Sequence, residues 1–160
     1  VLRIFVGEAE GPGYDEEVLV IETDIDDMEM EYLGAVIERI RSAGTIDVVH
    51  FPVSMKKGRT GIRISVTADA SRLDTIVGTI FAETTTFGLR WHTSSRRILH
   101  REEETFTTSY GPVRVKKGFD RSGALVKTHI EFDDVKAIAD ARGIPYREAL
   151  EKIKQELFGK

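Results

Sequence analysis

Six carboxylates stand within ten residues, in the segment ETDIDDMEME at positions 22–31. The segment follows an apolar run, Val-Leu-Val-Ile, that is typical of a strand, and Asp24, Asp26 and Asp27 fall where this strand is expected to end. In an extended strand Glu22, Asp24 and Asp26 share one face with like charges about 7 Å apart, which is unfavourable unless a cation lies among them. Clusters of oxygen ligands suit hard divalent ions such as Mg²⁺ and Mn²⁺. Asp24, Asp26 and Asp27 are therefore candidate metal ligands.

A second interpretation of the same acids needs no metal. Asp26 or Asp27 caps the helix that follows, while Glu29 and Glu31 favour the positive end of its dipole. This accounts for four of the six carboxylates but leaves Asp24 unexplained. Both interpretations remain open at this point.

Three cations gather in the segment MKKGRTG at positions 55–61, between two expected strands. Lys56, Lys57 and Arg59 surround Gly58, whose backbone can approach a ligand closely, and this combination suits phosphate oxygens. The segment is not a Walker loop, because GxxxxGK is absent. The alternative interpretation is a solvated hairpin tip.

Three consecutive hydroxyls, Thr84, Thr85 and Thr86, stand in the segment ETTTFGLR between an expected helix and an expected strand. They are a second candidate for contacts with phosphate. The alternative is an ordinary helix end, with Gly88 supplying a positive φ.

Other site chemistries are not visible in the sequence. The histidines show neither HxH nor HExxH spacing and are more typical of ordinary strand positions: His50, His92, His100 and His129. No GxSxG motif is present, and the absence of cysteine excludes thiolate sites and fits a reducing cytoplasm. A formal net charge of −4 argues against a general nucleic-acid binder, and no apolar run approaches the roughly 20 residues that span a bilayer.

Hydrophobic periodicity predicts an α+β protein. Apolar residues at helical spacing predict helices over 28–43 and from 70 onward, the second capped by Asp69, and Gly44 is expected to end the first in a left-handed conformation. Expected strands occupy 18–23, 46–55, 61–67 and 89–99. This order predicts a ferredoxin-like βαββαβ sandwich over residues 18–101. Trp91 on the open face of its sheet predicts a homo-oligomer.

The remaining residues predict a small subdomain of β-hairpin and helices over 102–160. Its hairpin is expected to turn at 110–112, and a further strand at 124–132. Asp133 is expected to cap a helix ended by Gly143, and Pro145 to open the last helix. Residues 1–17 are expected to form a strand and a linker. The start at Val1, without Met or a signal-like segment, predicts that the chain is cut from a longer polypeptide.

Five segments, taken together, resemble a known family in the same order along the chain. They are ETDIDDM, GTIDVVHFPVSMKKGRTGIRISV, FAETTTFGLR, REE with YGPVRVK, and GIPYREAL. The chain is similar, from about residue 2 to 158, to the carboxy-terminal half of LarC, the nickel insertion protein of the lactate racemase cofactor pathway.

The resemblance implies an enzyme, a nickel insertase of the lyase class also called a cyclometallase. Its substrates are the nickel ion and pyridinium-3,5-bisthiocarboxylic acid mononucleotide, and it depends on CTP with Mn²⁺ or Mg²⁺. The carboxy-terminal half is the part that binds the nucleotide and forms oligomers.

Carried over to this chain, the resemblance implies metal binding at Asp24, Asp26 and Asp27. It implies nucleotide binding at two sets of residues: Lys56, Lys57 and Arg59, and Thr84, Thr85 and Thr86. The family usually has Asn where this chain has Asp24, which preserves an oxygen ligand but changes the charge of the site. The amino-terminal half of the family is absent, so nucleotide binding without insertion is expected of this chain alone.

Two other function classes compete with this one. A non-catalytic ligand-binding or assembly module is the main alternative, because ferredoxin-like sandwiches often bind ligands without catalysis. An RNA binder is disfavoured, because the first and third strands lack the paired aromatic residues that stack bases.

Overall fold

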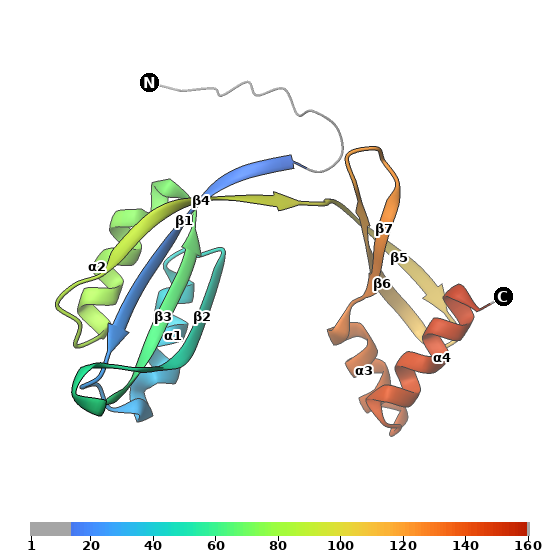
Figure 1. Cartoon of the computed structure of the whole chain (residues 1–160). Helices are drawn as coiled ribbons and strands as arrows, with labels where there is room; N and C mark the ends of the chain where they lie inside the picture. The colour runs from blue at the N-terminus through green and yellow to red at the C-terminus, as the bar shows by residue number, and fades with distance from the viewer. Residues whose placement is uncertain (1–13, 160) are drawn as a thin grey trace. The chain divides into compact units, whose positions relative to one another are not determined.

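The computed structural model describes residues 14–159, with the side chain of Tyr14 excepted. Residues 15–96 form one compact unit, and the residues from 97 onward form a second (Figure 1). The expected α+β class is confirmed, and each unit is built from one antiparallel sheet and two helices.

The first unit has a four-stranded sheet in the order β2-β3-β1-β4. Its elements follow one another as β1 (Tyr14–Ile25), α1 (Leu33–Ser42), β2 (Asp47–Ser54), β3 (Thr60–Ala68), α2 (Leu73–Glu83) and β4 (Arg90–Ile98). The strand β3 pairs antiparallel with both β1 and β2. This is the ferredoxin-like βαββαβ arrangement that the periodicity predicted.

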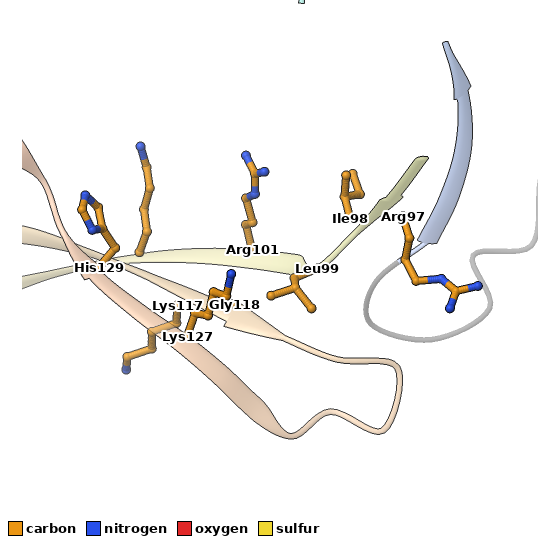
Figure 2. Close-up of a pocket in the computed structure, with 9 residues that line it drawn as sticks. Arg97, Ile98, Leu99, Arg101, Lys117, Gly118, Lys127 and His129 are labelled. Atoms are coloured by element: carbon orange, nitrogen blue, oxygen red, sulfur yellow. The ribbon is translucent and has the colours of Figure 1, made fainter. Parts of the chain in front are cut away.

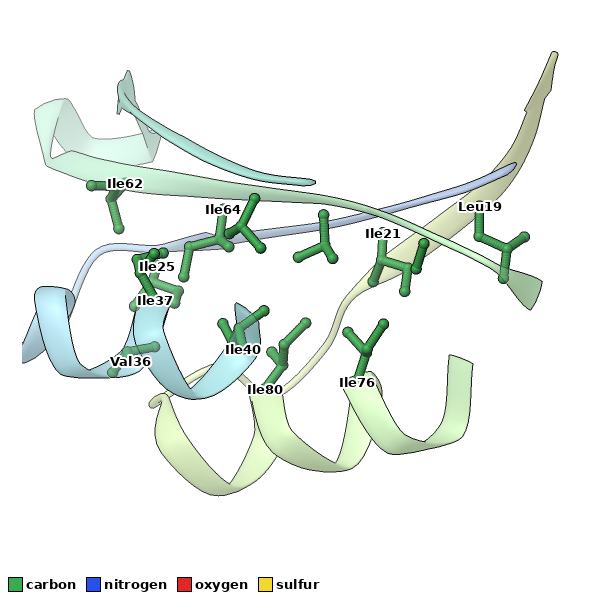
Figure 3. Packing of buried hydrophobic residues seen from close by; sticks show 13 residues of the cluster. Leu19, Ile21, Ile25, Val36, Ile37, Ile40, Ile62, Ile64, Ile76 and Ile80 are labelled. Atoms are coloured by element: carbon green, nitrogen blue, oxygen red, sulfur yellow. The ribbon is translucent and has the colours of Figure 1, made fainter. Parts of the chain in front are cut away.

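The core of the first unit lies between the sheet and its two helices. From Leu19 to Ile25 of β1 and from Ile62 to Ala68 of β3, every second residue is buried against the helices, while the residues between face the other side of the sheet. Figure 3 shows Ile40 of α1 and Ile76 of α2 directed into this layer. Each fully buried isoleucine contributes roughly 1.5–3 kcal/mol, so these alternating residues fix which face of the sheet is open.

Two element boundaries differ from the expectation. The strand β1 begins at Tyr14 rather than at 18, so residues 14–17 are strand and not linker. The charged residues there are compatible with a strand because Glu16 forms an ion pair with Arg96 of β4. The expected strand and turn before residue 14 lie outside the described residues.

The start of α1 also differs from the expectation. A 3-10 turn over Met30–Tyr32 precedes α1, and neither has a side-chain capping hydrogen bond. The prediction that Asp26 or Asp27 caps this helix is therefore wrong. Two local predictions are confirmed: Gly44 has a φ of 90°, and the carboxylate of Asp69 accepts a hydrogen bond of 2.8 Å from the Ser71 amide.

The second unit has a three-stranded antiparallel sheet in the order β5-β6-β7. Its elements are β5 (His100–Thr108), β6 (Gly111–Phe119), β7 (Leu125–Ile130), α3 (Phe132–Arg142) and α4 (Tyr146–Phe158). Val113 and Val115 of β6 are buried in one core with Val135 and Ile153 of the two helices. On the opposite face of this sheet Lys116 and His129 are exposed.

The helix ends of the second unit follow the sequence in part. Gly143 ends α3 with a φ of 62°, and α4 begins directly after Pro145, both as expected. Asp133 lies inside the first turn of α3, where Glu131 is the N-cap, so the prediction that Asp133 caps the helix is wrong. None of the described helices is long and apolar enough to cross a membrane.

Gly61 marks a position where β3 and β1 approach too closely for a side chain. An added Cβ would lie 2.5 Å from the carbonyl oxygen of Ile25 and 2.4 Å from the Met55 sulfur. We expect Gly61→Ala to lower the free energy of unfolding by about 1–3 kcal/mol, the usual cost of overpacking. Gly78→Ala is the matched control, because an added Cβ there meets nothing within 4 Å, and the change should raise stability by roughly 0.5–1 kcal/mol. Urea denaturation of both variants measures the difference, and equal effects would contradict the close approach.

Candidate functional site

The three segments that the sequence singled out meet at one end of the first unit. Arg59 of the β2–β3 turn lies 3.2 Å from Asp26, which directly follows β1. The Thr85 hydroxyl, between α2 and β4, donates a hydrogen bond of 2.5 Å to Asp27. Three stretches separated by more than 20 residues each are thus joined through the acids at the end of β1.

The threonine loop is anchored to β1 by a buried hydroxyl. The Thr23 and Thr86 hydroxyl oxygens are 2.7 Å apart, and they lie 3.0 and 2.8 Å from the carbonyl oxygen of Gly88. Thr84 donates to the Ile80 carbonyl and closes the last turn of α2. Two of the three consecutive hydroxyls therefore hold the loop in place, and Thr85 is the one that reaches the acids. Gly88 does not have the positive φ that was expected of it.

Asp24 is held by arginines from both neighbouring strands. Arg63 of β3 lies directly opposite Asp24 in the register and donates two hydrogen bonds to it, at 2.5 and 2.8 Å. Arg90 of β4 contacts both Asp24, at 3.5 Å, and Glu22, at 3.1 Å. The like charges on this face are thus balanced by two guanidinium groups.

This arginine pairing also sets the titration of Asp24. The hydrogen bonds from Arg63 hold the pKa of the Asp24 carboxyl below its usual value, although partial burial acts in the opposite direction. Arg63 and Arg90 lie 39 and 66 residues away from Asp24 along the chain, so the acidic segment by itself does not indicate these partners. The signal that could have found them is the alternation of β3, which places Arg63 on the open face.

Asp26 and Asp27 have fewer partners than Asp24. Asp26 has a contact with the half-exposed Arg59, and Asp27 is exposed and accepts one hydroxyl hydrogen bond. Within residues 14–159 no three acids or histidines converge as a ready-made metal site. Mg²⁺ in proteins is usually held by one or two carboxylates together with phosphate oxygens and waters. Asp26 and Asp27 fit an ion that arrives with a phosphate, whereas Asp24 is already paired with two arginines.

The basic turn between β2 and β3 contains exposed lysines and a backbone conformation that is uncommon for residues other than glycine. Lys57 has a φ of 61°, and it is the one residue other than glycine with a positive φ in the described part of the chain. Lys56 and Lys57 are exposed and form no ion pair with any residue that the structure describes. A lysine in this conformation costs free energy, and such residues often occur at binding sites. The turn therefore presents two unpaired cations beside the Asp26–Arg59 pair.

A cavity of about 420 Å³ lies between the start of α1 and the end of α2. Its wall is largely apolar with a polar edge, and it is lined by Met28, Tyr32, Ala35, Val36, Ala82, Glu83, Thr84 and Thr85. Thr85 joins this cavity to Asp27. No motif in the sequence indicates this cavity, because its wall is assembled from segments at two helices that meet only in the folded unit.

The arginine pairing of Asp24 predicts a pH-dependent contribution to stability. Because the folded pKa lies below the unfolded value of 3.8, the contribution is present above that value and is lost as the pH falls through the folded pKa. We expect Asp24→Asn to lower the free energy of unfolding at pH 7 by roughly 1–2 kcal/mol. This value lies between the usual contribution of an exposed ion pair and that of a buried hydrogen bond to a charged group. We also expect the variant to lose part of the acid sensitivity below about pH 4.

Asp27→Asn is the control for this experiment, because its exposed carboxylate accepts one hydroxyl hydrogen bond and no arginine contact. Chemical denaturation between pH 2 and pH 7 measures both effects. If the two variants show the same loss and the same pH dependence, Arg63 and Arg90 do not stabilise the fold through Asp24.

Curated relatives resemble the chain over nearly its whole length. A relative from Geobacter metallireducens is 39% identical over 156 residues, which is 98% of this chain and 40% of the relative. The pyridinium-3,5-bisthiocarboxylic acid mononucleotide nickel insertion protein of Clostridium kluyveri is 40% identical over 144 residues, 90% of this chain and 36% of that protein. The chain therefore spans about two fifths of the length of these relatives.

A solved structure shows the same fold. It is the apo form of LarC2, the carboxy-terminal domain of a cyclometallase involved in the synthesis of the NPN cofactor of lactate racemase. It matches 90% of this chain, and 99% of its own length, with a TM-score of 0.84 and 32% identity. The family model of the nickel insertion proteins matches residues 1–150, and the chain belongs to this family.

Proposed function

We propose that this chain is the nucleotide-binding part of a cytoplasmic enzyme of the lyase class that inserts nickel into pyridinium-3,5-bisthiocarboxylic acid mononucleotide. In this proposal nickel is a substrate ion, and CTP with Mn²⁺ or Mg²⁺ is the nucleotide that the chain binds. The name of the Clostridium kluyveri relative and the cyclometallase domain of the solved structure support the reaction. The absence of cysteine fits a reducing compartment.

The main support for a nucleotide site is that the cations of the basic turn lie beside the carboxylates at the end of β1. A triphosphate carries about four negative charges and needs both a divalent ion and several cations. Lys56, Lys57 and Arg59 supply the cations on one side, and Asp26 and Asp27 supply carboxylates on the other. When bound, the divalent ion neutralises phosphate oxygens.

The remaining residues of the site receive distinct roles. Asp24 holds Arg63 and Arg90 on the open face and thereby supports the strand end that carries Asp26. Thr85 orients Asp27, while Thr84 and Thr86 fix the loop that presents it. The apolar cavity beside Thr85 has room for the base, with Tyr32 and Met28 in its wall.

A metal-dependent titration tests the function. We expect CTP to bind with Mn²⁺ and much more weakly without it, as calorimetry measures. Asp26→Asn should weaken Mn²⁺-dependent binding by roughly tenfold or more, the loss of one charge-assisted contact, because it removes one carboxylate from the ion. Asp74→Asn, in the first turn of α2, removes an exposed carboxylate at the opposite end of that helix and should leave binding unchanged. CTP binding that is independent of metal and of Asp26 would favour the non-catalytic ligand-binding or assembly module.

We expect the basic turn to contact the outer phosphates of CTP, which CMP lacks. Lys57→Ala and Arg59→Ala should each cost about 1.5–3 kcal/mol of CTP affinity, or roughly ten- to a hundredfold, and less of CMP affinity. Lys57→Asn removes the charge while keeping a residue that tolerates positive φ, so it separates charge from turn geometry. Arg41→Ala, an exposed cation in the last turn of α1, is the control. Equal losses for CTP and CMP would mean that the turn does not contact the outer phosphates.

We also propose that the chain forms a homo-oligomer through the first unit. Val49 and Phe51 lie on the side of β2 away from the helices, since Val48 between Asp47 and Val49 is the buried residue. Phe87 is fully exposed. Trp91 is about half exposed, but the expectation that it lies on the open face is wrong, because its neighbour Arg90 contacts Asp24 on that face and strand alternation turns Trp91 to the other side. Exposed apolar groups of this size often mark an interface.

Sedimentation at micromolar concentration measures the oligomeric state. We expect a species larger than the 18.0 kDa chain, and Phe51→Ser together with Val49→Ser should shift it toward the monomer. Phe158→Ser removes an exposed aromatic residue at the end of α4 and serves as the control. A monomer of the unchanged chain would refute this proposal.

A further inference from the structure

The open face of the second sheet carries a cluster of basic residues around one glycine. In the register of β5, β6 and β7, Arg101 and Lys127 are both paired with Gly118. In the neighbouring row, Lys116 is paired with His129. These residues lie on the face opposite the helices, because the buried Val115 alternates with Lys116 along β6.

A cavity of about 350 Å³ opens on this face, and its lining includes Leu99, Arg101, Lys116, Gly118, Lys127 and His129. Figure 2 shows Arg101 and His129 rising from the same side of the sheet. Gly118 is buried beneath Leu99: an added Cβ would lie 3.0 Å from the Leu99 side chain and 3.7 Å from the Lys127 side chain. The missing side chain makes room for Leu99, which forms an apolar floor between the strands that carry the two cations.

The positive charge of this cavity is only partly balanced. Lys116 contacts Glu131 at 2.8 Å, and Lys117 pairs with Glu104. Arg101 and Lys127 are exposed and form no ion pair with any residue in the described part of the chain. The excess charge therefore lies at the Gly118 end, where two cations from the outer strands face the same space.

We propose that this cavity binds a phosphomonoester of mononucleotide size through Arg101 and Lys127. The two residues lie on strands separated by one strand, about 10 Å apart at the backbone. Their side chains can therefore close on a single phosphate above Leu99, which covers Gly118. A guanidinium group matches phosphate oxygens in a bidentate geometry. The volume suits a small ligand, since typical ligand cavities begin at about 300 Å³.

A nucleic acid fits this face less well than a small phosphomonoester. Glu102, Glu103 and Glu104 follow Arg101 directly on β5, and a phosphate chain would have to pass them. Among the described residues of β5, β6 and β7 there is no fully exposed aromatic side chain for base stacking.

The ligand can be named further only if the chain has the function proposed above. That enzyme handles two phosphate-bearing compounds, a nucleoside triphosphate and a pyridinium mononucleotide. The triphosphate site lies in the first unit, so the cavity of the second unit is assigned to the phosphate of the mononucleotide. The anion site itself does not depend on this identification.

Titration of the whole chain with nicotinamide mononucleotide tests the proposal, because this probe carries a pyridinium ring and one phosphomonoester. Amide shifts in ¹H–¹⁵N spectra should report binding at Gly118 and its neighbours. Nicotinamide riboside, which lacks the phosphate, should cause no shift there, and inorganic phosphate should bind at least tenfold more weakly than the mononucleotide. Arg101→Gln and Lys127→Gln should each reduce mononucleotide affinity at least tenfold.

Lys154→Gln is the matched control, because it removes an exposed, unpaired cation of the same unit from α4. The site is refuted if the double variant binds the mononucleotide as tightly as the unchanged chain. Equal affinity for inorganic phosphate, or for the riboside, refutes the assignment to a mononucleotide. An oligouridine that binds through the same residues more tightly than the mononucleotide would show a nucleic-acid surface instead.

The same variants separate this proposal from the proposed function. CTP binding with Mn²⁺ should persist in Arg101→Gln and Lys127→Gln, and mononucleotide binding should persist in Arg59→Ala. If CTP fails to bind the unchanged chain, the proposed function fails, while the loss of mononucleotide binding in the Arg101 and Lys127 variants still decides the anion site.

Discussion

The pairing of β1 with β3 positions both the core and the candidate site of the first unit. The register runs from Leu19 opposite Ala68 to Ile25 opposite Ile62, and it places Asp24 directly across from Arg63. A shift by one residue would move Ile21 and Ile25 to the open face and turn the acids toward the helices. Gly61 allows the last step of this pairing, because any side chain there would collide with the Ile25 carbonyl. The acids that follow β1 owe their position to this close approach.

Charge compensation across strands stabilises the first part of the acidic segment. Glu22 and Asp24 are balanced by Arg63 and Arg90, so their face of the sheet is stable by itself. Beyond the end of the strand the compensation is weaker, because Asp26 has one contact with Arg59 and Asp27 accepts one hydroxyl hydrogen bond. The acidic segment thus contains two different features, a structural ion-pair network within β1 and a more open pair of carboxylates beyond it.

Local signals predicted much of the fold, and long-range contacts account for most of what they missed. The helical spacing of Val36, Ile37 and Ile40, and the glycines at 44 and 143, act within a few residues and were correctly interpreted. The start of β1 was missed because this part of the strand lies beside β4, which is distant in sequence: Arg96 of β4 contacts Glu16 from 80 residues away. The capping role expected of Asp26 and Asp27 failed for a related reason: distant partners, Arg59 and Thr85, hold their carboxylates. The candidate site was predictable as three segments, but their meeting and the adjoining cavity were not.

The Asp26–Arg59 contact gives the site of the proposed function a specific thermodynamic character. Without a ligand, each group partly satisfies the other at 3.2 Å. A metal–nucleotide complex can replace this one contact with two, because the carboxylate turns to the ion while the guanidinium turns to a phosphate. A nucleotide without metal would engage Arg59 and leave Asp26 facing added negative charge, and a metal without nucleotide would leave Arg59 without its partner. Each component alone disrupts the ion pair and leaves one of its two groups without an opposite charge, so the geometry favours binding of the ion and the phosphates together.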